Sequence, residues 1–393
     1  MLKYFEMQDT YSNEEMLGAE FSICDSVKSI DRSDWDRIFG DIPEGYEFYR
    51  SVEESKLTEL RFYYALFTLD RRLAAIAPIF ACDFNLDIAV EGRLRSIILF
   101  IRKLFPRFLI VKALFCGSPF SEHGMIGLGG EVKNKTRVMN GFLKLLDLIS
   151  KRENAKLTVF KDFTEEGVAV LSGIIKRGYF KVNSFPSAVQ ELNFSSFEEY
   201  LKTLGKATRK SLRRKIKDAY SYGKIEVKVL NDLEGLTEDV YRLYLNTHGQ
   251  GATKFERLTR EFFISVSRNM QPFLKAFLYY VDGRLGAFNL CFVYKDLFID
   301  KFIGFDYDIS RRFHLYFVSW SYNIQWCIEN RIRFYKTGQT DYYAKIKLGS
   351  RLVPLYAYFK HRSAFFNMCL KLLSLGLKPG NFDSDIRDYA KNG

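Results

Sequence analysis

Cysteine and histidine are scarce in this chain, and neither residue is clustered. The six cysteines stand singly at positions 24, 82, 116, 291, 327 and 369, without a CxxC pair. In a chain of 393 residues, this spacing predicts reduced cysteines in the core rather than a disulfide framework. The four histidines also lie far apart, so we expect no metal site.

Long apolar runs are missing as well. No stretch approaches 18 uninterrupted apolar residues, which predicts that no transmembrane helix is present. The opening MLKYFEMQDT lacks a basic region followed by an apolar one, so we expect no signal peptide. Both absences favour a cytoplasmic protein, with peripheral contact at the inner membrane surface as the alternative.

Acidic residues are absent from a stretch in the first half. Between Gly92 and Ser121 there is no Asp or Glu, and six basic residues interleave with apolar ones. One interpretation is a basic amphipathic segment that lies on a membrane surface over residues 93–115. The other is a partly buried helix and strand with a basic edge, which Pro106 favours because it breaks a long helix. The six residues are Arg93, Arg95, Arg102, Lys103, Arg107 and Lys112.

A second stretch without acids lies at the start of the second half, where GKATRKSLRRKIKDA occupies positions 205–219. Seven of the twelve residues from Lys206 to Lys217 are basic, and the net charge of +12 favours anionic partners. On a helix, five of these cations share an arc of about 100° beside an apolar stripe. A solvated face is the alternative, but such faces usually include Glu. The five cations are Lys206, Arg209, Lys210, Arg213 and Lys217.

An internal similarity divides the chain. Residues 70–80 read DRRLAAIAPIF and residues 282–292 read DGRLGAFNLCF, with five of eleven positions identical. Each block follows an apolar run and predicts a strand, a tight turn and a second strand. Two hairpins can resemble each other by chance. The 212-residue offset, however, separates two halves of similar size and favours a duplication.

The second half predicts a helix, a strand, two helices, a hairpin, a strand, a helix and two strands. That order indicates a mixed α/β (α+β) fold with a largely antiparallel sheet. Five stretches of it resemble the GNAT acyltransferase superfamily, in particular its Fem-type branch, which is related to peptidoglycan biosynthesis. They are KATRKSLRRKIKDA, LTREFF, VDGRLGAFNLCF, FHLYFVSWSYNIQWCIENRIRFYKTGQ and DYYAKIKLG, and the resemblance covers residues 195–362.

The resemblance implies two GNAT-like lobes in tandem, each a mixed, largely antiparallel sheet flanked by helices. The first lobe would span residues 1–190, the second residues 191–375, and residues 376–393 would form a polar tail. In the first lobe the resemblance rests on the hairpin and on PFSEHGMIGL. The family's glycine-rich pyrophosphate loop has no clean copy, because YDISRRFHLYF follows the strand LFIDKFIGFD. That departure shifts weight from acyl-CoA toward other donors.

The implied activity is N-acyl transfer in cell-envelope biosynthesis. An acyl or aminoacyl group would pass from an activated thioester or ester to an amine of a phosphorylated acceptor, lipid-linked or small. Acyl-CoA or aminoacyl-tRNA would be the co-substrate, and no cofactor would be tightly bound. The alternative is a non-catalytic basic module that holds RNA or an anionic membrane surface on a GNAT-like scaffold.

The stretches that carry the resemblance also contain the candidate site residues. Asp300 puts a charge into an apolar strand, as a base or amine anchor, or else as half of an ion pair at a sheet edge. His314, before a helix, is a candidate catalytic residue, or else a capping or packed histidine. Tyr343 is a candidate proton donor to the leaving group. Gly338, Gln339 and Asp341 follow a strand end and are candidates for substrate or donor binding, or else form an ordinary turn. Lys345 suits a phosphate or carboxylate of the acceptor, or else is a solvated lysine. In the basic helix Arg209, Lys210, Arg213 and Arg214 suit phosphate contacts.

Overall fold

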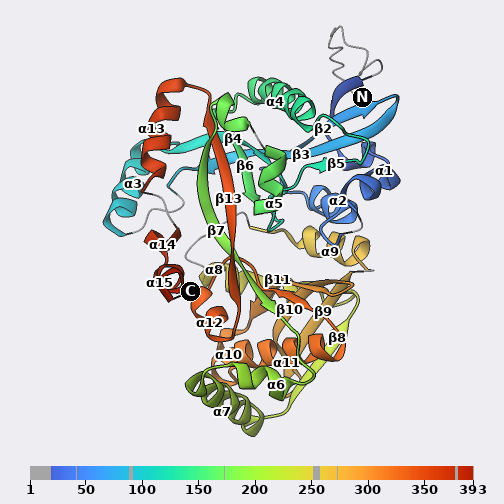
Figure 1. Cartoon of the computed structure of the whole chain (residues 1–393). Helices are drawn as coiled ribbons and strands as arrows, with labels where there is room; N and C mark the ends of the chain where they lie inside the picture. Colours follow the sequence, from blue (N-terminus) through green and yellow to red (C-terminus); the bar gives the residue numbers. More distant parts are fainter. Residues whose placement is uncertain are drawn as a thin grey trace. The chain divides into compact units, whose positions relative to one another are not determined.

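The computed structural model describes residues 19–40, 42–87, 92–171, 173–250, 257–271, 273–376 and 379–392, and the stretch MLKYFEMQDT lies outside them. These residues form two compact units (Figure 1). The first contains the chain up to Tyr49, Thr58–Phe185 and the chain from Pro354 onward, and the second contains Arg50–Leu57 and Pro186–Val353. None of the helices in the described ranges combines the length and apolar character of a membrane span.

The first unit is built on a mixed sheet with the strand order β1-β2-β3-β4-β6-β13, and β5 pairs with β3. Helix α4 covers one face, where Phe142 packs with Phe21, and Trp35 of α1 lies in a second apolar cluster. The strands are β1 Ala19–Cys24, β2 Arg61–Leu69, β3 Arg72–Asn85, β4 Ile110–Cys116, β5 Gly127–Leu128, β6 Leu157–Phe163 and β13 Arg351–His361. The helices are α1 Arg32–Phe39, α3 Gly92–Leu104, α4 Lys135–Arg152, α5 Glu165–Val168, α13 Ala364–Ser374, α14 Pro379–Phe382 and α15 Ser384–Asn392.

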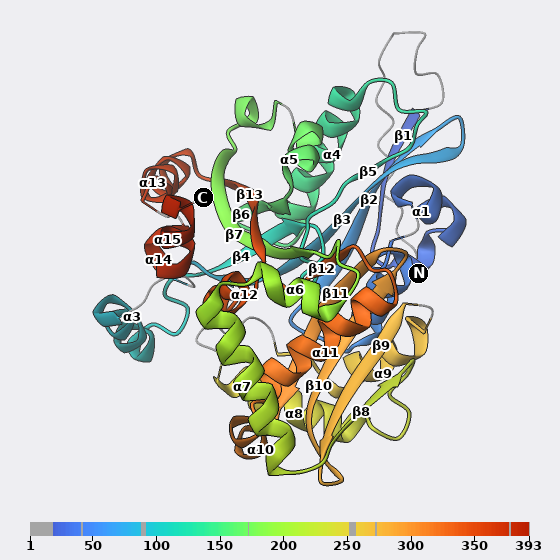
Figure 2. The same ribbon diagram turned by 60° about the horizontal axis from the view of Figure 1, so that its bottom comes forward.

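The second unit has the strand order β7-β12-β11-β10-β9-β8. Helices α6, α7 and α11 pack on one face of these strands (Figure 2), and α9 packs on the other through Phe262 and Phe263. The strands are β7 Phe180–Glu191, β8 Ile225–Leu230, β9 Leu274–Val281, β10 Arg284–Tyr294, β11 Leu297–Phe305 and β12 Phe334–Lys336. The helices are α6 Phe197–Thr203, α7 Lys206–Tyr222, α8 Thr237–Gln250, α9 Arg260–Asn269, α10 Tyr307–Arg312, α11 Leu315–Glu329 and α12 Tyr342–Lys347.

The two similar hairpins share their turn and an irregularity. Both turns place two residues at positive φ, Asp70 and Arg71 in one and Asp282 and Gly283 in the other, as a two-residue hairpin loop requires. In each hairpin the second strand then carries one extra, unpaired residue, at positions 74 and 286. The carbonyl of each extra residue accepts a backbone N–H at 2.8 Å. The turns and the extra residues of the two hairpins are therefore separated by the same 212 residues. The fold as a whole is the mixed, two-lobed α/β architecture that the sequence predicts.

The boundaries of the units differ from the predicted 1–190 and 191–375. The last part of β13 pairs with β6 in the first unit, for example Lys360 with Thr158, so residues from Pro354 onward belong there. The side chain of Asn367 on α13 donates to the Gly178 carbonyl at 2.9 Å in the same unit. The polar tail contains the helices α14 and α15. Strand pairing between segments far apart in the sequence sets these boundaries, and no local pattern marks it.

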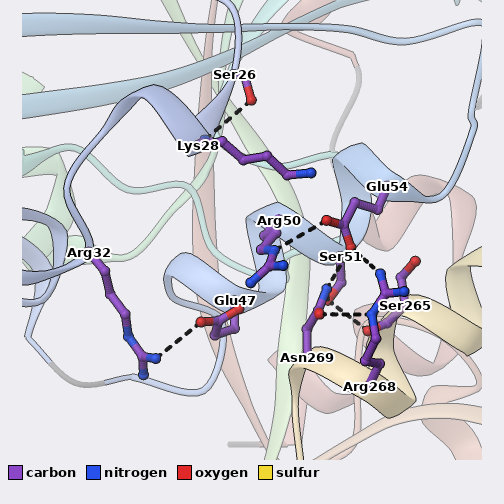
Figure 3. A network of polar contacts seen from close by, with 10 residues as sticks. All are labelled: Ser26, Lys28, Arg32, Glu47, Arg50, Ser51, Glu54, Ser265, Arg268 and Asn269. Carbon is purple, nitrogen blue, oxygen red and sulfur yellow. Dashed lines mark hydrogen bonds and ion pairs between the residues drawn. The ribbon is translucent and has the colours of Figure 1, made fainter.

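Helix α2, Tyr46–Glu54, ends in the second unit, where a polar cluster joins it to α9 (Figure 3). The Glu54 carboxylate accepts hydrogen bonds from Arg50 at 3.2 Å, Arg268 at 2.6 Å and Asn269 at 2.9 Å. The Ser51 hydroxyl donates to the Ser265 carbonyl at 3.3 Å. Because one carboxylate serves three donors on two helices, Glu54 is the central residue of this cluster.

We expect Glu54→Ala to lower the free energy of unfolding by about 1–2 kcal/mol, because three donors lose a charged acceptor. Urea unfolding followed by circular dichroism measures the change. Glu198→Ala is the matched control. It breaks the exposed ion pair between Glu198 and Arg213, which is worth roughly 0.5 kcal/mol or less. Equal effects of the two substitutions would contradict a central role for Glu54.

Candidate active site

Two parallel strands of the second unit separate at a fork. Strands β11 and β12 pair only from Leu297 to Ile299 on one side and from Phe334 to Lys336 on the other. The next residue on β11 is Asp300, and a bulge follows at Lys301 because Cys291 pairs with Asp300 and Leu290 with Phe302. Beyond the fork the edge of β11 that faces β12 no longer has a strand partner among the described residues.

The Asp300 carboxylate lies at this fork as the end point of a buried hydrogen-bond network. It accepts from Asn289 Nδ2 at 2.9 and 2.8 Å and from the Tyr335 hydroxyl at 2.9 Å. Asn323 of α11 donates to the Tyr335 hydroxyl at 3.4 Å and accepts from the Tyr279 hydroxyl at 2.7 Å. The network joins four strands to α11, so the position of the carboxylate is fixed by the sheet and by the helix above it.

Burial raises the pKa of Asp300 above its ordinary value, and the hydrogen bonds and the charge of Lys345 oppose this rise. Lys345 of α12 is itself only 6% exposed, and its ammonium group donates to the Thr337 carbonyl beside the fork. A buried carboxylate that titrates above its usual range, near a buried cation, is typical of a functional site. The ion pair at a sheet edge that the sequence left open for Asp300 is not among its contacts in the described residues, which are hydrogen bonds from Asn289, Tyr335 and Cys291.

Three further residues lie close to the same fork. The charges of Asp341 and Asp300 both raise the pKa of Tyr316 of α11, after the larger effect of burial. Within the described ranges the Tyr316 hydroxyl is buried without a hydrogen-bond partner. Gly338 has φ +80°, and a Cβ there would lie 3.9 Å from the Lys345 ammonium. Asp300, Lys345, Tyr316, Asp341 and Gly338 therefore form the candidate site.

The structure does not bring all predicted residues to this site. Tyr343 lies on the outer side of α12 and is 61% exposed, whereas its neighbour Tyr342 is buried and donates to the Pro186 carbonyl at 2.8 Å. Gln339 follows Gly338 and is half-buried. His314 precedes α11 in a left-handed conformation, and its side chain does not cap the helix. It therefore stands two residues before Tyr316, without a described contact to Asp300.

Some cations of helix α7 contact α6, and others are exposed to solvent. Arg209 donates to the Leu201 and Lys202 carbonyls at the end of α6, and Arg213 forms an exposed ion pair with Glu198 of α6, so both contact α6. Lys210 and Arg214 are exposed. Together with the exposed Lys206 and Lys217, they form a row at helical spacing, which we call the α7 stripe. Of the four predicted phosphate ligands, Lys210 and Arg214 remain available.

The segment between β11 and α10 accounts for the missing glycine-rich loop. The Asp306 carboxylate accepts from the backbone N–H groups of Asp308 and Ile309 at 3.2 and 3.4 Å. It also accepts from Arg284 at 2.7 Å. The protein's own carboxylate thus occupies the N–H groups at the start of α10, where a phosphate would otherwise bind. The start of α11 has no side-chain cap.

The sequence analysis did not identify Tyr316 of the candidate site or the residues that hydrogen-bond around Asp300. Asn289 interrupts the apolar strand LGAFNLCF in the same way that Asp300 interrupts its own, and that signal was available. Tyr335 and Tyr316 stand in aromatic-rich segments, where nothing local separates them from core residues. Among the described residues, no group of His, Cys, Asp and Glu side chains is arranged to hold a metal ion.

Known proteins resemble this chain in one domain and in the overall fold. Residues 206–345 match the model of the acetyltransferase (GNAT) domain, a span that contains α7, the fork and Lys345. Two curated proteins of Mycobacterium tuberculosis, strains CDC 1551 and H37Rv, are each 23% identical over 325 residues. Both carry the name "Putative 8-amino-7-oxononanoate synthase 2". The match covers 81% of this chain and 42% of each relative, so the chain spans less than half of their length.

Among solved structures, FemX has a TM-score of 0.50 with this chain at 12% identity, and the match covers 82% of this chain and 92% of FemX. At that identity the likeness concerns the fold. The domain match covers the fork and the buried residues around it, and the fold match extends over both units. Residues 206–345 are therefore similar to a GNAT acetyltransferase domain, and the fold of the chain is similar to that of FemX.

Proposed function

We propose that this protein is an N-acyltransferase whose reaction takes place at the fork between β11 and β12. The observation that supports the proposal is the half-buried Asp300 carboxylate, with a raised pKa, near the buried Lys345 and the Tyr316 hydroxyl, which has no hydrogen-bond partner among the described residues. Direct transfer of an acyl group to an amine needs a proton acceptor for the ammonium and a proton donor for the leaving oxygen or sulfur.

The residues fit those two tasks. Asp300 accepts a proton from the acceptor ammonium, and its raised pKa makes it a stronger base than an exposed carboxylate. The amine then attacks the carbonyl carbon of the donor, and backbone N–H groups at the end of the β11–β12 pairing stabilise the negative oxygen that forms. The Tyr316 hydroxyl donates a proton to the leaving oxygen or sulfur as its bond to the carbonyl carbon breaks, and the new amide nitrogen returns a proton to Tyr316. Lys345 holds the fork closed at Thr337 and offsets the negative charge of Asp300.

For the donor, we propose an aminoacyl ester of tRNA rather than acyl-CoA. The N–H groups at the start of α10 are already satisfied by Asp306, and a diphosphate beside that carboxylate would be repelled. The α7 stripe presents four exposed cations without an acid between them, which suits the phosphate backbone near the acceptor end of a tRNA. The acceptor is then the amine of a phosphorylated small molecule or a lipid-linked precursor.

Filter binding with aminoacyl-tRNA tests the role of the α7 stripe. We expect Lys210→Glu with Arg214→Glu to weaken binding by at least roughly tenfold. The slope of the logarithm of the binding constant against the logarithm of the salt concentration should become shallower by about one for each cation removed. Lys133→Glu with Lys135→Glu changes the charge equally at exposed positions of the first unit and should leave binding nearly unchanged. Equal loss in both variants would show that only net charge matters.

The second candidate is a non-catalytic module that binds RNA through the same stripe. The position of four exposed cations on one helix favours it, and fold alone does not decide activity. The two functions can be told apart by whether the protein removes the acyl group from the donor. An acyltransferase releases deacylated tRNA or free CoA in the presence of an amine acceptor, whereas a binding module retains the RNA and releases neither.

A further inference from the structure

Two helices of the first unit expose their apolar sides instead of burying them. Seventeen large apolar side chains are exposed in the described ranges. Six belong to α3 and the residues after it, and six to α13 and the residue after it. The first six are Ile97, Leu99, Phe100, Leu104, Phe105 and Phe108, and the second six are Phe365, Phe366, Met368, Leu372, Leu373 and Leu375. These twelve side chains define what we call the α3–α13 face.

Helix α3 is oriented with its apolar side outward. Ile97, Phe100 and Leu104 recur at helical spacing and are 54%, 65% and 70% exposed. The inward side carries Ile98, which is buried, and Arg102, which pairs with Asp87 and donates to the Phe108 carbonyl at 3.0 Å. Surface helices usually turn their apolar side toward the core and their charged side toward solvent. In α3 an arginine contacts the rest of the unit and the apolar side is exposed.

Helix α13 has no buried residue at all along its eleven positions. It is joined to the unit by Asn367, which accepts from the His361 N–H at 2.7 Å and donates to the Gly178 carbonyl. A helix of this length is marginal in water without tertiary packing. Figures 1 and 2 show α3 and α13 on the same side of the first unit, with α14 and α15 between them in Figure 2.

The charges around the face indicate what covers it. Both helices lie in stretches without acids, residues 92–121 and 342–382, and Lys103 and Lys371 are exposed on the helices themselves. Acids return only at Asp383, which caps α15. We propose that the α3–α13 face docks on the surface of an anionic lipid bilayer, with the apolar side chains in the interface and the cations at the headgroups. A second copy of the chain fits less well, because twofold pairing would set the same cations against one another.

Sedimentation of the full chain with sucrose-loaded vesicles tests the proposal. We expect binding to phosphatidylcholine vesicles that contain phosphatidylglycerol, and weaker binding to phosphatidylcholine alone. Leu372→Glu with Leu373→Glu on α13, and Phe100→Glu with Leu104→Glu on α3, should each lower the partition constant at least roughly tenfold. Because these side chains are exposed, circular dichroism should show an unchanged fold.

The matched control is Leu148→Glu with Ile175→Glu, which makes the same charge change at exposed apolar positions of the same unit outside the face. It should change the partition constant by less than about twofold. Failure of the native chain to bind anionic vesicles overturns the proposal, and so does equal loss in all three variants. Light scattering that shows a dimer split by Leu372→Glu with Leu373→Glu would assign the face to a second copy. The assay uses neither donor nor acceptor, so its failure leaves the proposed acyl transfer untouched.

Discussion

Replacing Asp300 by Asn should abolish most of the acyl transfer and leave the fold as stable as before. The carboxylate is the proposed base, so we expect a loss of roughly hundredfold or more in kcat. Stability should hold because a buried charge costs free energy. The new amide also offers a donor to Asn289 Oδ1, which is buried without a partner in the described part of the chain. Turnover and thermal unfolding, measured on the same preparation, check both expectations.

Tyr279→Phe is the matched control for that substitution. It removes the hydroxyl that donates to Asn323 at the far end of the same network. We expect a loss of about 1 kcal/mol in the free energy of unfolding and turnover within a few-fold of the native value. If Tyr279→Phe and Asp300→Asn impair turnover equally, Asp300 has only a structural role.

The pH dependence of stability follows from the raised pKa of Asp300. Because the folded state holds this proton more tightly than the unfolded chain does, protonation stabilises the fold between the ordinary and the raised pKa. Stability contributed by this group therefore falls as the pH rises through that window, while activity that needs the ionised base rises. Asp300→Asn should remove this component from the stability curve. Parallel curves for native protein and variant would contradict the raised pKa.

Replacing Lys345 by Met should have the largest effect on stability. The ammonium group is buried and lowers the pKa of Asp300, and its removal leaves a buried carboxylate without that compensation. Loss of the hydrogen bond to the Thr337 carbonyl and of the positive charge near Asp300 should together cost about 2–3 kcal/mol, and the pKa of Asp300 should rise further. Denaturant unfolding measures the loss, and pH titration of the variant measures the shift.

A double substitution separates the charge effect from simple loss of packing. With Asp300→Asn in the same chain, Lys345→Met should cost at least about 1 kcal/mol less than it does alone, because no buried charge is left uncompensated. Activity should stay lost. Lys347→Met on the exposed side of α12 is the control and should change stability by no more than about 0.5 kcal/mol. Strictly additive effects of the two substitutions would contradict the coupling of Asp300 and Lys345.

The parts of this fold that could be predicted from the sequence are those with local causes. Both hairpins follow from apolar runs around an Asp-containing turn, and α7 follows from Leu212, Ile216 and Ala219 at helical spacing. Asp300 was identifiable because a charge in an apolar strand needs a reason. Asn289 interrupts its own apolar strand in the same way, but its contact with Asp300, like those of Tyr335 and Asn323, depends on strand pairing and on the position of α11.

Other features depend on contacts that leave no local trace. The pairing of β13 with β6 joins residues far apart in the chain, so the units could not be delimited correctly. Arg209 and Arg213 look like phosphate ligands in a basic run, yet the end of α6 and Glu198 engage them. Helix α13 has the apolar composition of a core helix, and only the structure shows that it has no buried residue.

Photoaffinity labelling locates the reaction most directly. Two donors that carry a diazirine in the acyl group, one an aminoacyl-tRNA and one an acyl-CoA, are irradiated with the native chain, and the labelled peptides are mapped by mass spectrometry. If the acyl group reacts at the fork, the label from the aminoacyl-tRNA falls on β11, the start of α11 or α12. Excess unlabelled donor should abolish it, and the acyl-CoA should label weakly. Label confined to the first unit, or to α7 alone, would contradict an acyltransferase site at the fork.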